Sequence, residues 1–335
     1  MKVAHVMAGA AHGGAELFYE RLVRAQHDAG DDVLAVLRPD PQRLARLEGI
    51  ATRPLRFGPP WDLATPIRLR RALRDFAPQV AVAWMNRASA VLPRGSWVSA
   101  GRLGGYYPLR HYARCDHLIG NTRGIVEWLR GRGWPAARTH HLPNFVADYA
   151  GVAAAADVAL LPRPILLGLG RLHTDKGFDT LIRALPGLPG SLAIAGTGPE
   201  RRRLATLARD QGVAERISWL GWRDDAGALL AAADVFVCSS RIEPLGNMVL
   251  EAWSAGRPVV AADADGPREL LRDGVDGLLV PRDDATALAA AILRALDARR
   301  AQDLAAAGRH RFEASFAQQS VLAQWRETLS GLRKA

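Results

Sequence analysis

Short apolar segments alternate with segments of helical periodicity along the first half of the chain. Apolar segments at 3–7, 32–37, 79–84, 96–100 and 117–120 predict strands, and the patterns at 15–29 and 66–75 predict helices. Continuous apolar strands are typical of parallel sheets that helices cover on both faces. The first half therefore predicts an α/β domain with a parallel sheet.

The same alternation restarts after a proline-bounded stretch of small residues at 147–164. Two runs of strand–helix alternation predict two doubly wound, Rossmann-like domains, at 1–155 and 156–315, that face each other across a cleft. Ligands of such sheets bind beyond the carboxyl ends of the strands. The strands predicted in the second half are 165–168, 192–195, 217–220, 235–238, 259–261 and 278–280, and the helices are 178–185, 200–211, 226–232, 245–255, 266–273, 285–300 and 318–332.

The passage SSRIEPLGNMVLEAWSA places Glu243 and Glu251 on either side of a predicted helix start. A helix that begins near Leu245, after Pro244 and before a run of apolar residues, puts Glu251 about one and a half turns in. At about 1.5 Å of rise per residue the two carboxylates stand roughly 10 Å apart. That span matches a nucleotide sugar from ribose to hexose, with the helix N-terminus suited to a diphosphate. The alternative is that both are solvated helix charges.

A basic loop follows the first strand of the second half and reads GRLHTDKGF. Arg171 and Lys176 flank this loop, so both side chains can converge on one phosphate group, the arginine as a fork and the lysine as a point charge. The other two lysines of the chain, Lys2 and Lys334, lie near its ends. In a sequence that otherwise uses arginine, an internal lysine indicates a site that requires an ammonium group, with chance as the alternative.

Three further strand-to-helix junctions carry candidate contacts. Gly14, in AHGGAE, lets the backbone approach a ligand and precedes helix N–H groups that can bind an anion, although a simple turn glycine fits equally. Gly198, in GTGPE, would border a nucleotide. Trp222 and Arg223, in GWRDD, would supply a contact to a base, although a buried Trp222 is equally consistent. No complete G-x-G-x-x-G fingerprint occurs, and the histidine and acidic residues have no metal-site spacing.

Composition limits the class of protein. A chain of 335 residues that is 49% hydrophobic can form two domains of ordinary size. Cys115 and Cys238 cannot build a disulfide framework, and Cys238 lies in an apolar strand, so the cytoplasm is the expected compartment. The N-terminus lacks the layout of a cleavable signal, and no segment approaches the roughly 18 apolar residues that span a bilayer.

Charge is distributed unevenly. Residues 1–155 carry 21 Lys and Arg against 12 Asp and Glu, whereas residues 156–335 carry 23 against 22. The basic first half indicates an anionic partner, either a membrane surface or an anionic acceptor, while the alternative is an arginine-rich proteome. Nothing resembles an RNA-binding aromatic motif or a zinc-finger spacing, so nucleic acid is not expected as a partner.

Together these motifs resemble the retaining glycosyltransferases of family 4 (glycosyl transferases group 1). The resemblance is dense over 165–295, through GRLHTDKGFDTLIRAL, AGTGPE, LGWRDD, the two glutamates and GPRELLRDGVDGLLVPRDDATALAAAI. It is looser in the first half, through GGAE, CDHLIGNT and HLPN. It implies the GT-B fold, in which a C-terminal helix, here 316–335, packs back on the first domain. It also implies transfer of a sugar from a nucleotide donor with retention of configuration, without a metal or other cofactor.

The resemblance also assigns roles by position. Arg171 and Lys176 would grip the donor diphosphate and stabilise it as it leaves, and Glu243 would hold hydroxyls of the donor sugar. Glu251 would bind the ribose hydroxyls. Leu245, Gly246 and Asn247 at the helix start would meet the sugar or the phosphate, and Gly14 would approach the donor phosphate from the other domain.

Two positions depart from the family pattern, and both lie on the acceptor side. Arg102, in SAGRLGG, stands near the place where the family often has a histidine close to the reacting sugar. Asn144 is followed by phenylalanine where the family has Asn-Gly. The acceptor is therefore less predictable than the class of donor.

The sequence predicts a cytoplasmic, hexosyltransferase-type enzyme of cell-envelope or lipopolysaccharide assembly, peripheral at the inner face of the cell membrane. Its substrates would be a nucleotide-diphosphate sugar and a glycan or lipid-linked acceptor. The alternatives are another nucleotide-sugar enzyme on a similar fold, such as an epimerase or a phosphorylase, and a non-catalytic sugar-nucleotide-binding subunit. A nicotinamide oxidoreductase is opposed by the missing fingerprint.

Overall fold

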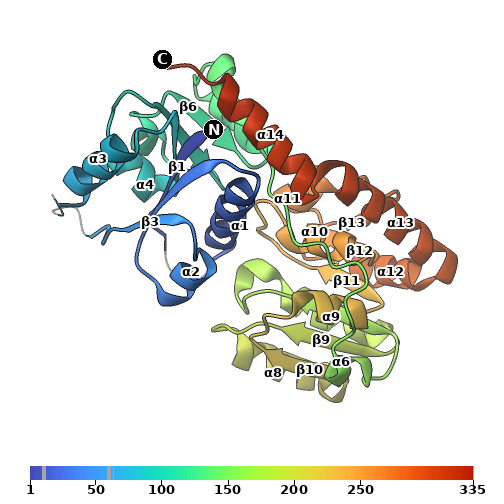
Figure 1. The fold of residues 1–335 in the computed structure, drawn as a ribbon. Coiled ribbons are helices and arrows are strands. Elements are labelled where there is room, and N and C mark those ends of the chain that lie inside the picture. The colour runs from blue at the N-terminus through green and yellow to red at the C-terminus, as the bar shows by residue number, and fades with distance from the viewer. Residues whose placement is uncertain (10–12, 59–61, 63, 335) are drawn as a thin grey trace. The chain divides into compact units, whose positions relative to one another are not determined.

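The computed structural model describes residues 1–9, 13–58, 62 and 64–334, and the chain divides into two compact units (Figure 1). Unit 1 comprises Met1–Asn144 and Gln318–Ala335, and unit 2 comprises Phe145–Ala317. Each unit contains one parallel sheet with helices on both faces, which confirms the predicted pair of Rossmann-like folds. No helix in the described part of the chain is long and apolar enough to cross a membrane.

Unit 1 is built on a seven-stranded sheet in the order β3-β2-β1-β4-β5-β6-β7. The chain order reverses direction between β1 and β4, which makes that pair the switch point of the sheet. The strands are β1 (Lys2–Met7), β2 (Asp32–Leu37), β3 (Ala51–Pro54), β4 (Val80–Trp84), β5 (Val98–Leu103), β6 (His117–Gly120) and β7 (Thr139–His141), and the helices are α1 (Gly14–Asp28), α2 (Pro41–Arg46), α3 (Ala64–Phe76), α4 (Met85–Val91), α5 (Arg123–Gly131) and α14 (Gln318–Gly331).

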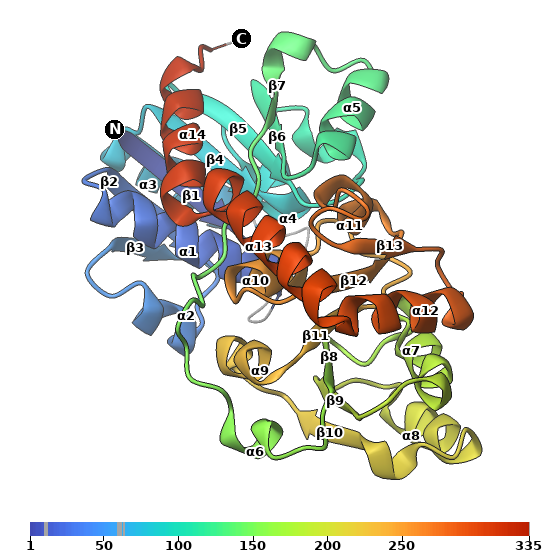
Figure 2. The same ribbon diagram turned by 90° about the vertical axis from the view of Figure 1, so that its right-hand side faces the viewer.

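The core of unit 1 fills both faces of this sheet. Helices α3 and α4 pack on one face through Leu69, Leu73 and Ala88. On the other face, α1 and α14 lie side by side (Figure 2). There the fully buried Trp325 of α14 stacks on Trp84 at the end of β4, with ring centroids 6.1 Å apart. Helix α14, at the end of the described chain, is therefore part of the same hydrophobic core as the first strands of unit 1.

Unit 2 is built on a six-stranded sheet in the order β10-β9-β8-β11-β12-β13, with its switch point between β8 and β11. Its two apolar layers lie under α9, α10 and α13 on one face and under α7, α8 and α12 on the other. The strands are β8 (Ile165–Leu169), β9 (Ser191–Ala195), β10 (Ile217–Gly221), β11 (Val235–Cys238), β12 (Val259–Ala262) and β13 (Leu278–Val280), and the helices are α6 (Ala156–Ala159), α7 (Phe178–Ala184), α8 (Arg201–Asp210), α9 (Ala226–Ala232), α10 (Asn247–Ser254), α11 (Asp265–Leu270), α12 (Ala285–Leu296) and α13 (Ala298–Ser315).

The division between the units precedes the small-residue stretch that marks the predicted boundary at 155. Val146 and Ala155 are buried in the core of unit 2. The backbone N–H of Ala155 also donates to the carbonyl oxygen of Ala228, 2.9 Å away. This segment therefore packs as part of unit 2 because its few apolar residues find a core there.

The prediction of one helix at 285–300 is wrong, because two helices meet at Asp297. This residue is extended, and its carboxylate accepts the N–H of Arg300 at 2.9 Å, so it ends α12 and caps α13. The short edge strands β3 and β7 were not predicted, since the sequences ATRP and THH are largely polar. Helices α2, α4 and α5 were not predicted either.

Candidate functional site

The loops after β8 and β11 meet at the switch point of unit 2. The first loop carries Arg171 and Lys176 and the second carries Glu243. Gly177 has a left-handed backbone with φ of 60°, and a Cβ there would lie 2.0 Å from the carbonyl oxygen of Ser239. Only glycine permits this approach, which brings the two loops into contact.

Lys176 and Glu243 form an ion pair between these loops. The Lys176 Nζ donates to Glu243 Oε2 at 2.5 Å, and the two side chains are 21% and 11% exposed. Ser239 Oγ donates to the carbonyl oxygen of Lys176 at 3.0 Å, and Ser240 Oγ donates to Glu243 Oε2 at 3.4 Å. The structure thus brings together a cation and a carboxylate that the sequence separates by 67 positions.

Arg171 lies in the same loop as Lys176 and is exposed. Within the described residues its side chain has no hydrogen bond or ion pair, so its guanidinium is available to an anionic ligand. One loop of unit 2 therefore holds one exposed and one paired cation beyond the carboxyl end of β8.

Helix α10 begins at Asn247, two residues after the predicted start. Gly246 precedes it with φ of 92°, a left-handed conformation that helical residues do not adopt. Leu245 is buried before this turn, at 6% exposed. Glu251 is consequently the fifth residue of α10, just over one turn in, and is half-buried.

Arg241 organises the loop after β11, and sequence analysis missed it. Its guanidinium donates to both carboxylate oxygens of Asp179 at 2.8 and 2.9 Å and to the carbonyl oxygen of Thr174 at 2.7 Å. It therefore ties the glutamate loop to the lysine loop and to α7. Asp179 lies 62 positions away in the chain, so no local pattern indicates the pair.

Asp179 is held as a carboxylate by these contacts. Burial raises the pKa of Asp179, but hydrogen bonds from Arg241 and Arg183 outweigh burial and bring the pKa to about 2, below the ordinary 3.8. A depressed folded-state pKa contributes stability above the ordinary pKa, and that contribution disappears as the pH falls toward 2.

The remaining candidates of unit 2 lie beyond β9 and β10. A Cβ on Gly198 would lie 2.3 Å from the carbonyl oxygen of Leu172, so this turn packs against the loop of Arg171. Trp222 is 68% exposed, which resolves the alternative of a buried tryptophan. Arg223 forms ion pairs with Asp157 and Asp225 at 2.6 and 2.5 Å. Its guanidinium thus orders the loop in which it lies.

Three candidates lie at the carboxyl edge of the sheet of unit 1. Gly14 is the exposed first residue of α1, while His12 of the same motif lies outside the described residues. Arg102, the last residue but one of β5, is only 1% exposed and donates to Asn144 Oδ1 at 2.5 Å. Its guanidinium lies 4.9 Å from the ring centroid of Trp84, and burial lowers its pKa to about 10. Arg102 is therefore a buried support for Asn144 rather than an exposed cation.

The described residues contain no group of three or more His, Cys, Asp or Glu side chains that could hold a metal ion. The cations of unit 2 are the groups that can balance a diphosphate. That the protein works without a metal stays a prediction. Both cysteines are buried and unpaired.

Comparison with known proteins relates this chain to a family. Residues 163–298 match the family model described as glycosyl transferases group 1. The chain is 38% identical over 306 residues to the lipopolysaccharide core biosynthesis glycosyltransferase LpsE of Rhizobium meliloti, covering 87% of this chain and 88% of LpsE. It is 36% identical over 311 residues to LpsD of the same organism, covering 89% and 88%.

The crystal structure of Anabaena Alr3699/HepE in complex with UDP matches the fold. It superimposes with a TM-score of 0.85 at 22% identity, over 99% of this chain and 100% of that one. At this identity the likeness shows the fold, which is GT-B.

We expect Asp179→Asn to destabilise the protein by about 2 kcal/mol at pH 7, because two arginines lose their carboxylate. The difference from the unaltered protein should persist at pH 5 and shrink below pH 4. Urea unfolding at pH 7, 5 and 3 measures it. Asp210→Asn, at the exposed end of α8, is the control and should cause little change. Equal destabilisation by both variants, or a difference in stability that does not change with pH, would contradict the role of Asp179 as a stabilising carboxylate.

Proposed function

Because this chain belongs to the glycosyl transferases group 1 and has the GT-B fold, we propose that it transfers a hexose from a nucleotide-diphosphate sugar to a lipopolysaccharide-type acceptor with retention of configuration. The pairing of Lys176 with Glu243 at the switch point of unit 2 is the observation that carries this proposal. In this proposal the lysine would bind a phosphate, and the neighbouring carboxylate would bind sugar hydroxyls.

The donor would lie along the carboxyl edge of unit 2. Arg171 and Lys176 bind the diphosphate, and the first N–H groups of α10, beginning at Asn247, face the same charge. Glu243 accepts hydrogen bonds from the sugar, and Glu251 accepts them from the ribose. Gly198 and Trp222 border the nucleotide.

The reaction breaks the bond between the anomeric carbon and the diphosphate oxygen. The acceptor oxygen forms its bond to the anomeric carbon on the same face, and its proton passes to the departing phosphate oxygen. Negative charge grows on the diphosphate during this step, so two preorganised cations lower the barrier. Glu243 holds the sugar and is not proposed as a nucleophile, and no metal or other cofactor takes part.

On the acceptor side we propose that Arg102 acts by fixing Asn144. Gly14, at the start of α1, would let the donor phosphate approach the backbone of unit 1. The acceptor would be a glycan of the lipopolysaccharide core, as the names of LpsE and LpsD indicate for those proteins. The enzyme would act in the cytoplasm, at the inner face of the membrane.

The proposed reaction is tested with a panel of nucleotide sugars, UDP-sugars first. Only donors that bind the folded protein should raise its melting temperature. The best donor, incubated with truncated lipopolysaccharide core, should give a product whose anomeric NMR signals have the configuration of the donor. Inversion would refute retention. Donor binding without turnover would identify a non-catalytic subunit, and turnover without an acceptor would identify an epimerase.

The donor-site residues predict separable kinetic defects. Lys176→Ala and Arg171→Ala should each lower kcat about a hundredfold or more, because each removes charge stabilisation of the leaving diphosphate. Glu243→Gln should also lower kcat, while free UDP binds no more weakly than before. Glu251→Gln should mainly raise KM and weaken the binding of UDP, since the ribose is present throughout the reaction.

Arg299→Ala removes an exposed arginine from α13 and serves as the matched control. Steady-state kinetics and UDP titration of all five variants provide the measurements. Activity close to that of the unaltered protein in both Lys176→Ala and Arg171→Ala would refute the proposal that these two residues bind the diphosphate.

Helix α3 supports docking of unit 1 on an anionic membrane. It reads ATPIRLRRALRDF, and its exposed residues include four arginines and Ile67, which is 70% exposed. A basic helix with an exposed apolar side chain can lie on an anionic lipid surface.

Vesicle sedimentation at low salt should therefore retain the protein on phosphatidylglycerol but not on phosphatidylcholine. Arg70→Gln/Arg74→Gln on α3 should lower retention severalfold, whereas Arg53→Gln/Arg56→Gln, elsewhere on unit 1, should not. Equal retention on the two lipids would exclude electrostatic docking.

A further inference from the structure

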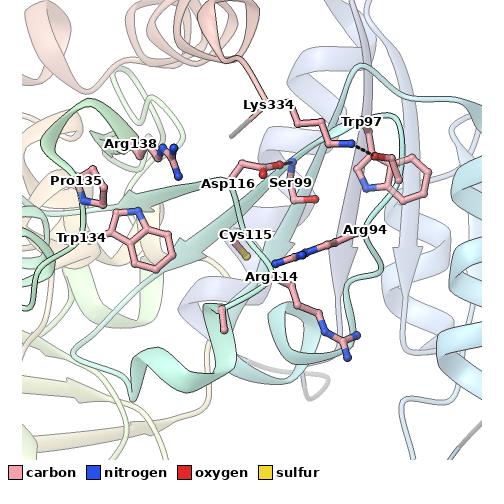
Figure 3. Close-up of a pocket in the computed structure, with 12 residues that line it drawn as sticks. Arg94, Trp97, Ser99, Arg114, Cys115, Asp116, Trp134, Pro135, Arg138 and Lys334 are labelled. Carbon is pink, nitrogen blue, oxygen red and sulfur yellow. Dashed lines mark hydrogen bonds between the residues drawn. The ribbon is translucent and has the colours of Figure 1, made fainter.

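Unit 1 contains a pocket of about 490 Å³ that the proposed transfer reaction does not use (Figure 3). Its lining comes from residues that precede strands: Trp97 before β5, Asp116 before β6 and Arg138 before β7. The pocket therefore lies at the amino edge of the sheet. Arg102 and Asn144 lie at the opposite, carboxyl edge.

The lining of this pocket is strongly basic. It contains Arg94, Arg114, Arg138 and Lys334, against one carboxylate, Asp116. All four cations are exposed. Within the described chain, none of the three arginine side chains has a hydrogen bond or an ion pair. A hollow lined by one sign of charge concentrates ions of the opposite sign.

The cations do not all face the same way. In Figure 3, Arg94 and Arg138 extend from opposite sides toward Cys115 and Asp116. Lys334 lies at the rim, where its ammonium donates to the carbonyl oxygen of Gly95 at 2.5 Å. Arg94 and Arg138 are thus the cations whose side chains extend into the pocket.

Two tryptophans complete the lining, and both carry a donor without an acceptor. The indole Nε1 atoms of Trp97 and Trp134 are buried and have no hydrogen-bond partner among the described residues. Trp97 is only 2% exposed as a whole. Buried donors normally find partners, so two orphan N–H groups on residues that line a basic pocket are consistent with an acceptor-rich ligand.

From this charge, volume and donor set we propose that the pocket binds a phosphate-bearing ligand, at a site separate from the donor site of unit 2. Guanidinium groups recognise phosphate oxygens through paired N–H donors. A pocket of this volume accommodates a phosphate together with the group that it esterifies. The ligand is either a soluble phosphate ester or the headgroup of an anionic lipid.

The test uses Arg171→Ala/Lys176→Ala protein, because the proposed donor site would also bind phosphate. Pyrophosphate and glycerol phosphate should raise the melting temperature of this protein by on the order of 2 °C near saturation. Adding Arg94→Gln/Arg138→Gln should weaken binding at least about tenfold and abolish the shift. Adding Arg70→Gln/Arg74→Gln instead removes the same amount of charge from α3 and should preserve the shift in melting temperature.

The two sources of phosphate are separated with phosphatidylglycerol vesicles. Weaker retention of Arg94→Gln/Arg138→Gln than of the unaltered protein assigns the pocket to a lipid headgroup, and equal retention assigns it to a soluble ester. The proposal of this phosphate site is refuted if neither compound shifts the melting temperature. It is also overturned if the shift survives Arg94→Gln/Arg138→Gln, or if the α3 variant loses it equally.

Discussion

The close approach of Gly177 to Ser239 is the constraint on which the proposed donor site of unit 2 depends. A side chain at position 177 would occupy the space of the Ser239 carbonyl oxygen. With glycine there, the loops after β8 and β11 touch, and Lys176 reaches Glu243. Arg241 also joins the loop after β11 to the loop after β8 through Thr174, and to α7 through Asp179. A backbone contact and a partly buried ion pair thus position side chains that lie far apart in sequence.

In the proposed donor site, the charges at this edge are suited to a diphosphate. A lysine that already has a carboxylate partner is preorganised, and its ammonium can exchange that partner for a phosphate oxygen without first being ordered. An arginine that has no partner, such as Arg171, gives the site net positive charge beside this neutral pair. The buried Arg102 of unit 1 differs from Arg171, because its guanidinium already contacts Asn144 and the faces of two aromatic rings.

Sequence patterns predicted the sheets well where strands are apolar and buried. β2, β6, β11 and β13 have the expected bounds because each is a short apolar run between turns. Edge strands such as β7, with the sequence THH, lack that pattern and were missed. Lys176 and Glu243 could be chosen as candidates because each lies in a loop that follows an apolar strand. Arg241 was missed because its role depends on Asp179, a contact that only the folded chain creates.

Unit 1 is discontinuous, and this has a consequence for its synthesis. The Trp84 surface that Trp325 covers stays uncovered until residues 318–331 have left the ribosome. All of unit 2 is made in the interval, so its core can close first. The strands of unit 1, which precede unit 2 in the chain, thus complete their packing last, and throughout that interval the indole face of Trp84 at the end of β4 is open to chaperones.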